Sequence, residues 1–423
     1  MRTSKQQFWI NFAAASTGNL FEHYDKALFA FLAPFLAPLF FETSSPITAL
    51  IYTYAMMPLG LFSRPLGALI FGRIGDRRGR KSALCLTLLG MALTTTLMGC
   101  IPTYKTVGWV APSLLALGRL IQNFFASGET TGGSLLILES CPNERRSFYN
   151  GLYGCSTILG ILIASFGVTA LSFQGSIETT WRMLYWIGGI TGAFGLFMRF
   201  YAVEGEIAIK PRISILPLLW KYRFQFLMIV FTSGFSYANY YMITSFLNGY
   251  LPLIGSITKG EAMQANTYIL GFDFLLLPLA GILATRFPKE KLLLFFGGLI
   301  CVLAIPLYSF LPTAPLMVVM AIRLVFVSFG VGFSVVLAPF YQDLIPAESR
   351  YTLIAFGNAI GSQLLGTSAC SFSFFLYKQT GWAASPALYL MGLATVAIFS
   401  VYLGSRILTS SLSKEKERDA ESH

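Results

Sequence analysis

The stretch Gly72-Arg-Ile-Gly-Asp76-Arg77-Arg-Gly79-Arg80-Lys81 is a short basic segment between two long apolar runs, and it decides the fold. Residues 52–71 are largely apolar and carry one charge, Arg64. Residues 82–101 carry no charge. About 20 apolar residues make a helix long enough to cross a bilayer, and basic loops favour the cytoplasmic side. The glycines let two helices end and reverse within a few residues. The stretch therefore predicts two membrane spans joined by a tight cytoplasmic turn.

This turn resembles the signature between the second and third helices of major facilitator superfamily transporters. The alternative, an ordinary basic cytoplasmic loop, accounts for the positive charge but not for the aspartate and the three glycines. The resemblance implies a cytoplasmic gate, which we expect to contain Gly72, Asp76, Arg77, Gly79, Arg80, Lys81, Glu139, Arg145 and Arg146.

The composition excludes an ordinary water-soluble domain. Of the 423 residues, 55% are hydrophobic and 12% are charged, about half the charged share of a soluble protein. A net charge of +11 is also found in nucleic-acid-binding proteins, but here the basic residues are dispersed in short loops, so no nucleic-acid partner is expected. The six cysteines have no metal-ligand spacing. We therefore predict no metal and no cofactor.

Apolar stretches of span length recur along the whole chain. They are centred near residues 25, 60, 92, 120, 158, 192, 238, 273, 301, 326, 363 and 395. The sequence thus predicts an all-α membrane protein with twelve transmembrane helices. With the N-terminus inside, only four of the 30 basic residues fall in outer loops, namely Lys105, Arg182, Lys259 and Lys378. Both termini are therefore predicted to be cytoplasmic.

An internal repeat divides the chain into two halves. Arg119 and Arg323 are separated by 204 positions, and so are Glu144 and Glu348 in the loops that follow. We expect an N-terminal six-helix half over residues 1–203, a cytoplasmic linker over 204–223, a C-terminal six-helix half over 224–408 and a disordered tail over 409–423. Two homologous halves suit alternating access to one central site.

Charged residues within the spans mark the predicted site, since a charge at bilayer depth needs a partner or a wet cavity. Two polar stripes are expected to face each other on the first and fourth spans, although plain charge neutralisation is an alternative. A carboxylate that exchanges an arginine for a proton can couple transport to the proton gradient; the candidates are Asp25, Glu129 and Glu22. The predicted substrate-binding residues are Tyr24, Arg64, Arg119, Gln122, Asn123, Asn239, Tyr240 and Tyr241.

Four further residues keep two interpretations each. His23 is either a proton relay or a fixed hydrogen-bonding partner, and Lys26 either holds a neighbouring carboxylate ionised or replaces the proton as the coupling charge. Asp273 and Arg323 are either a plain ion pair or substrate contacts.

A narrower resemblance rests on Gly18-Asn19-Leu-Phe-Glu22-His-Tyr24-Asp25, Gly128-Glu129-Thr-Thr-Gly132 and Glu139-Ser-Cys-Pro142. These motifs resemble the metabolite:proton symporter family, and most of all its proline/betaine branch. The resemblance implies proton-driven uptake of a small polar metabolite across a bacterial inner membrane. The family pattern has Trp at the position of His23 and usually Phe at that of Lys26, which makes Glu129 the preferred proton carrier.

The predicted protein is a multi-pass secondary transporter that works as a monomer in the lipid bilayer. Its expected substrate is a zwitterion such as proline or betaine, because the buried charges number four of each sign. An organic acid such as 2-oxoglutarate, citrate or shikimate is the alternative, favoured if two arginines face one cavity. An intramembrane enzyme is a different class; Gly234-Phe-Ser236 is reminiscent of a nucleophile turn, but only His23 lies within a span. No enzyme activity is expected.

Overall fold

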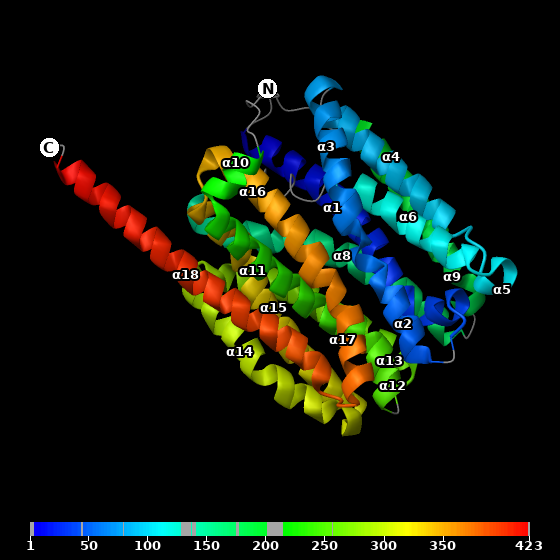
Figure 1. Cartoon of the computed structure of the whole chain (residues 1–423). Helices are drawn as coiled ribbons and strands as arrows, with labels where there is room; N and C mark the ends of the chain where they lie inside the picture. Colours follow the sequence, from blue (N-terminus) through cyan, green and yellow to red (C-terminus); the bar gives the residue numbers. More distant parts are fainter. Residues whose placement is uncertain are drawn as a thin grey trace.

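The computed structural model describes residues 4–43, 45–78, 80–127, 137, 141–174, 177–200, 215–255 and 257–421. These residues form a bundle of long helices (Figure 1). Helices are expected because backbone groups in lipid must be hydrogen-bonded within the chain. The N-terminal half contains α1 (Ser4–Phe40), α2 (Pro46–Ala55), η1 (Met57–Leu59), α3 (Gly60–Arg78), α4 (Arg80–Met98), α5 (Tyr104–Val107), α6 (Val110–Ala126), η2 (Asn143–Arg145), α8 (Arg146–Phe173) and α9 (Ile177–Phe200).

The C-terminal half repeats this succession of long helices, with two π-helical segments inserted. Its elements are α10 (Ile215–Lys221), α11 (Arg223–Tyr241), the π-helix η3 (Met242–Phe246), α12 (Leu247–Ile254), α13 (Lys259–Ala284), α14 (Lys289–Phe310), η4 (Leu311–Thr313), α15 (Leu316–Leu344), α16 (Ala347–Ile360), the π-helix η5 (Gly361–Thr367), α17 (Ser368–Thr380) and α18 (Ser385–Glu421).

Helix ends follow local chemistry. The Thr258 hydroxyl accepts a hydrogen bond from the Glu261 backbone N–H at 3.2 Å, and the Glu261 carboxylate accepts one from the Thr258 N–H at 2.8 Å. This reciprocal capping box starts α13. At the end of α17, Gly381 has φ of 65°, a left-handed conformation that glycine adopts without steric cost.

Every one of the predicted span centres lies in a helical segment of the structure. Seven stretches within the described residues are also long and apolar enough to cross a membrane: Pro46–Phe71, Arg146–Phe173, Lys259–Ala284, Lys289–Thr313, Leu316–Leu344, Thr352–Thr380 and Ser385–Gly404. Helix α1 is not in this group because of its charged and polar residues. Helices α4 and α6 are not in it because their apolar parts are too short.

The chain begins and ends at the same end of the bundle, where α1 starts and α18 leaves the other helices (Figure 1). We call this the terminal end and the other the opposite end. The structure continues α18 through Glu421, whereas the sequence predicted a disordered tail from residue 409. Lys, Glu and Arg are good helix formers, so the polar tail can extend a helix that has already been nucleated.

Glycines allow the closest helix contacts. A Cβ atom at Gly160 of α8 would lie 2.1 Å from the Leu20 carbonyl oxygen of α1. Between the halves, a Cβ at Gly151 of α8 would lie 2.6 Å from the Leu277 oxygen, and one at Gly281 of α13 would lie 2.8 Å from the Ser147 oxygen. Helices α8 and α13 thus meet backbone to backbone.

Gly160→Ala is expected to lower thermal stability, because the added methyl group meets a backbone oxygen that cannot rotate away. Overpacking of this kind costs about 1–3 kcal/mol. Thermal unfolding of the detergent-solubilised protein, followed by size-exclusion chromatography, measures the effect. Gly298→Ala in α14 is the control, since nothing lies within 4 Å of its Cβ. Equal midpoints for the two variants would contradict the close packing of α1 on α8.

Candidate functional site

Helix α1 carries the first group of buried charges. The Lys26 ammonium forms an ion pair with Glu22, one turn earlier on the same helix. Glu22 is fully buried and Lys26 is largely buried. In this structure Lys26 is thus paired with Glu22 and not with Asp25.

Asp25 ends a hydrogen-bond chain that joins three helices. Arg119 of α6 donates to the Gln122 side-chain oxygen at 2.6 Å, and the Gln122 amide donates to the Thr95 hydroxyl of α4 at 3.0 Å. Thr95 in turn donates to the Asp25 carboxylate at 2.8 Å. Thr95 was not among the predicted site residues, because a threonine in an apolar span carries no signal until its neighbours are known.

Arg64 of α3 meets the same polar group from another side. Its Nε donates to the Asn123 side-chain oxygen at 3.2 Å, while the Asn123 amide donates to the Arg119 carbonyl at 2.9 Å. The Arg64 and Arg119 charges lie close enough to act on each other, and both act on Lys26. Two predicted substrate-binding arginines thus lie near each other, and Asn123 binds the side chain of Arg64 and the backbone of Arg119.

The C-terminal half reaches this group through Gln363 of η5. A Cβ atom on Gly60 would lie 2.3 Å from the Gln363 side-chain oxygen and 2.7 Å from that of Asn123, so glycine is needed where the two amides approach. The Gln363 oxygen is buried and has no hydrogen-bond partner within the described residues. Gln363 was also not among the predicted site residues. It lies in a π-helical segment, which is typical of functional positions but is visible only in the structure.

Arg119 is stabilised by an aromatic ring as well as by amides. Its guanidinium carbon lies 4.4 Å from the centre of the Phe29 ring of α1, a cation–π contact that partly replaces lost water. Among the described residues, neither Arg119 nor Arg64 forms an ion pair with a carboxylate. Both guanidinium groups are therefore buried with neutral hydrogen-bond partners, while the Asp25 charge acts on Arg119 and the Glu22 charge on Arg64 without direct contact.

The aromatic and imidazole groups of α1 have structural partners. The Tyr24 hydroxyl donates to the Leu184 carbonyl of α9 at 2.9 Å, which fixes its ring beside Gly188. His23 Nδ1 lies 2.8 Å from the Asn19 carbonyl in the preceding turn. These contacts favour fixed hydrogen bonding over a relay for His23.

The second half holds a separate polar cluster. Arg323 is fully buried, and it donates to the Ala262 carbonyl at 3.3 Å and to the side-chain oxygens of Asn248 and Asn266. The structure shows no ion pair between Arg323 and Asp273 among the described residues. The plain ion pair is therefore wrong for this conformation. The Arg323 guanidinium binds Asn266 instead, which lies seven residues, or about two turns, before Asp273 on α13.

The remaining predicted substrate contacts lie on α11. Asn239 is buried and donates to the Phe326 carbonyl of α15 at 3.4 Å. The Tyr240 and Tyr241 rings are half-buried, with centroids 6.2 Å apart, and the Tyr241 hydroxyl feels the charges of both Arg64 and Arg119. Tyr241 thus belongs to the arginine group, whereas Asn239 and Tyr240 lie nearer to the second-half cluster.

The predicted gate is only partly described. The backbone of α3 ends at Arg78 and that of α4 begins at Arg80, as the turn predicts; Gly72, Asp76, Arg77, Arg80 and Lys81 fall within these helices. Gly79, Glu129 and Glu139 lie outside the described residues. Arg145 is exposed, while Arg146 lies 3.8 Å from Asp343, which also pairs with Lys289 of α14.

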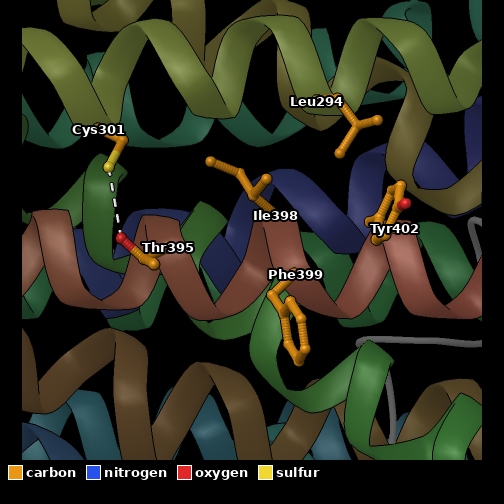
Figure 2. A pocket seen from close by; sticks show the side chains of 6 residues that line it. All are labelled: Leu294, Cys301, Thr395, Ile398, Phe399 and Tyr402. Atoms are coloured by element: carbon orange, nitrogen blue, oxygen red, sulfur yellow. Dashed lines mark hydrogen bonds between the residues drawn. The ribbon is translucent and has the colours of Figure 1, made fainter.

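A groove on the bundle surface is a poor alternative site. Figure 2 shows this groove, of about 520 Å³, between α14 and α18; it is lined by Leu294, Cys301, Thr395, Ile398, Phe399 and Tyr402. The Cys301 thiol and the Thr395 hydroxyl are 3.4 Å apart and use each other as hydrogen-bond partners. The lining carries no charge, so this groove lacks the groups that would orient a polar metabolite.

Several transporters are similar to this chain over most of its length. The citrate-proton symporter of Klebsiella pneumoniae is 28% identical over 90% of this chain and 88% of its own length. A putative proline/betaine transporter of Staphylococcus haemolyticus is 28% identical over 94% and 89%, and the alpha-ketoglutarate permease of Escherichia coli is 28% identical over 93% of each. These relatives are transporters, not enzymes.

The fold has solved counterparts too. The crystal structure of a D-xylose-proton symporter matches with a TM-score of 0.76 at 14% identity, over 93% of this chain and 97% of the other. The human organic anion transporter MFSD10 matches with a TM-score of 0.67 at 14% identity, over 95% and 100%. Residues 16–369 match the sequence model of the Major Facilitator Superfamily. With this match spanning most of the chain, the protein belongs to the major facilitator superfamily.

Proposed function

We propose that this transporter is a proton symporter for a small organic acid that carries more than one carboxylate. One observation carries the choice of substrate: the buried Arg64 and Arg119 charges lie near enough to act on each other, and their side chains are hydrogen-bonded to the neutral amides of Asn123 and Gln122. A buried guanidinium without a counter-ion is costly, and it suits a carboxylate bidentately. The relatives include a citrate-proton symporter and an alpha-ketoglutarate permease, which supports the same class.

The count of buried charges favoured a zwitterion, but their arrangement shifts the balance. Lys26 and Glu22 neutralise each other, and Asp273 and Arg323 both lie in the C-terminal half, where Arg323 binds Asn266. Arg64, Arg119, Asp25 and, from the sequence, Glu129 remain of the eight charges. If both of these carboxyl groups are protonated when the substrate binds, two positive charges are left for the substrate.

A zwitterion such as proline or betaine is the second candidate. Asp25 is joined to Arg119 through Thr95 and Gln122, so an ionised Asp25 would place a negative charge near the arginines and could meet an ammonium group. Relatives named as proline/betaine transporters support this alternative.

Transport is proposed to proceed by alternating access between two six-helix halves with both termini in the cytoplasm. At the opposite end, the halves touch where Lys259 donates to the Pro34 carbonyl at 2.9 Å and Tyr54 donates to the Ser245 carbonyl at 2.9 Å. At the terminal end, Asn150 donates to the Val335 carbonyl at 3.1 Å. Rocking would have to exchange these contacts, and the predicted gate would lie at the terminal end.

Proton coupling is assigned to Asp25 and Glu129. Glu22 is the weaker of the original candidates, since Lys26 stabilises its ionised form. The location proposed for the protein is a bacterial inner membrane, where a proton gradient is available, and the monomer is the proposed unit.

The proposal is tested by external pH in a lightly buffered suspension of de-energised cells that express the protein. Citrate, 2-oxoglutarate, proline and betaine are added in turn. Alkalinisation with citrate or 2-oxoglutarate is the expected result. Alkalinisation with proline or betaine alone would establish the second candidate, and none with all four, from protein shown to be in the membrane, would reject proton symport of these substrate classes.

Thr95→Val is expected to reduce proton-driven accumulation about tenfold or more, because it removes the hydroxyl that joins Asp25 to Gln122. A buried group that loses its partner costs about 1–3 kcal/mol. Radiolabelled substrate uptake in proteoliposomes with an imposed pH gradient measures the loss. Thr94→Val is the matched control, since the Thr94 hydroxyl bonds only to Gly90 on its own helix. Equal uptake by both variants would remove Thr95 from the site.

Arg64→Gln and Arg119→Gln are each expected to raise the KM for the transported acid by more than tenfold, since a charge-assisted hydrogen bond contributes about 1.5–3 kcal/mol. Arg64→Lys should recover only part of the loss, because an ammonium cannot bind two oxygens in a fork. Arg286→Gln, at an exposed position after α13, is the control. Unchanged KM values in both glutamine variants would favour a purely structural role for the two arginines.

A further inference from the structure

Asp273 is a buried carboxyl group that the proposed site does not use. It lies on α13 and is 3% exposed. Its Oδ1 atom has no hydrogen-bond partner, and within the described residues it forms no ion pair. An ionised carboxylate buried in this way would cost several kcal/mol, whereas a protonated one would not. In this conformation Asp273 is therefore best occupied by a proton.

Within the described residues, no positive charge on the neighbouring helices is in contact with Asp273 to replace that proton. From α8, the titratable group that feels Asp273 is the Cys155 thiol; from α11, it is the Tyr240 hydroxyl. The Tyr240 hydroxyl is itself buried without a hydrogen-bond partner among the described residues. From α15, Arg323 is engaged by Asn266, seven residues before Asp273, which is about 10 Å along the helix.

The position of Asp273 links its protonation to the contact between the two halves. The Cys155 thiol of α8 donates to the Phe274 carbonyl of α13, next in sequence to Asp273, with a separation of 3.5 Å. On the same pair of helices, Gly151 and Gly281 let the backbones touch. Any rocking of one half against the other must loosen or slide this α8–α13 contact.

We propose that Asp273 is a second proton-binding site, which keeps its proton while α8 and α13 are packed and releases it when water reaches the carboxyl group as the halves separate. The site lies in the C-terminal half, whereas Asp25 lies on α1. Its role in transport rests on the proposed proton symport, but the presence of the proton can be measured without any substrate.

Infrared spectroscopy of the purified protein in lipid tests the site directly. At neutral pH, the C=O stretching band of protonated carboxylic acids should lose intensity in Asp273→Asn. Glu42→Gln is the control, because Glu42 is an exposed carboxylate outside the helices and should leave the band unchanged. A band of wild-type intensity in Asp273→Asn would show an ionised Asp273 and overturn the proposal.

A second variant keeps the test decisive if Asp273→Asn does not fold. In Asp25→Asn labelled with carboxyl-¹³C aspartate, the isotope-shifted part of the band should persist, since Asp273 still holds a proton. Disappearance of the shifted band in this variant would reject the site. Neither result depends on whether the cell-suspension assay finds proton symport, so the two proposals can fail separately.

The link to helix packing has its own measurement. Cys155 is the sole cysteine in a variant with the other five replaced by serine, and a membrane-permeant maleimide reports access to the α8–α13 contact. Alkylation should accelerate at alkaline pH more steeply with Asp273 than with Asp273→Asn. Because an ionised Asp273 disfavours the neighbouring thiolate, thiol ionisation alone would give the steeper slope in Asp273→Asn, so the expected order reports the opening of the contact. The same slope in both proteins would refute the coupling between this proton and the contact.

Discussion

Burying two arginines in an apolar bundle is the constraint on which the rest of the site depends. The Asn123 side chain accepts a hydrogen bond from Arg64 and donates one to the backbone carbonyl of Arg119. Gln122 and the Phe29 ring complete the surroundings of Arg119. Amides and an aromatic face satisfy hydrogen bonds without cancelling positive charge. The arrangement therefore holds the guanidinium groups in place while their charge stays available for an anion.

The same constraint applies to α1, which carries three charged residues near its middle: Glu22, Asp25 and Lys26. Lys26 and Glu22 neutralise each other within one turn, so neither needs a partner from another helix. Asp25 instead reaches across to Thr95 and so connects α1 with α4 and α6. A carboxyl group held by a neutral hydroxyl can take or lose a proton with less rearrangement than one locked to an arginine.

Arg119 and Arg323 occupy repeat-related positions, but the two halves surround them with different partners. Arg119 lies near Arg64 and Gln363, at the meeting of both halves, whereas Arg323 is enclosed by Asn248, Asn266 and the Ala262 carbonyl. The repeat in sequence therefore conserves the charge but not its surroundings. This asymmetry suits a transporter in which one half orients the substrate and the other provides the moving contact.

The sequence by itself determined the helical membrane class, the placement of the spans and the turn between α3 and α4, because apolar length and glycine chemistry are local properties. It also marked the buried charges, since each is an exception within an apolar run. It did not reveal Thr95 or Gln363, whose side chains are unremarkable in sequence, nor that Lys26 pairs with Glu22 while Arg323 binds Asn266 in place of Asp273. Only the tertiary structure decided these partners, because they depend on distances between helices that are far apart along the chain, and a side chain with several possible partners takes the one that packing brings within hydrogen-bonding reach.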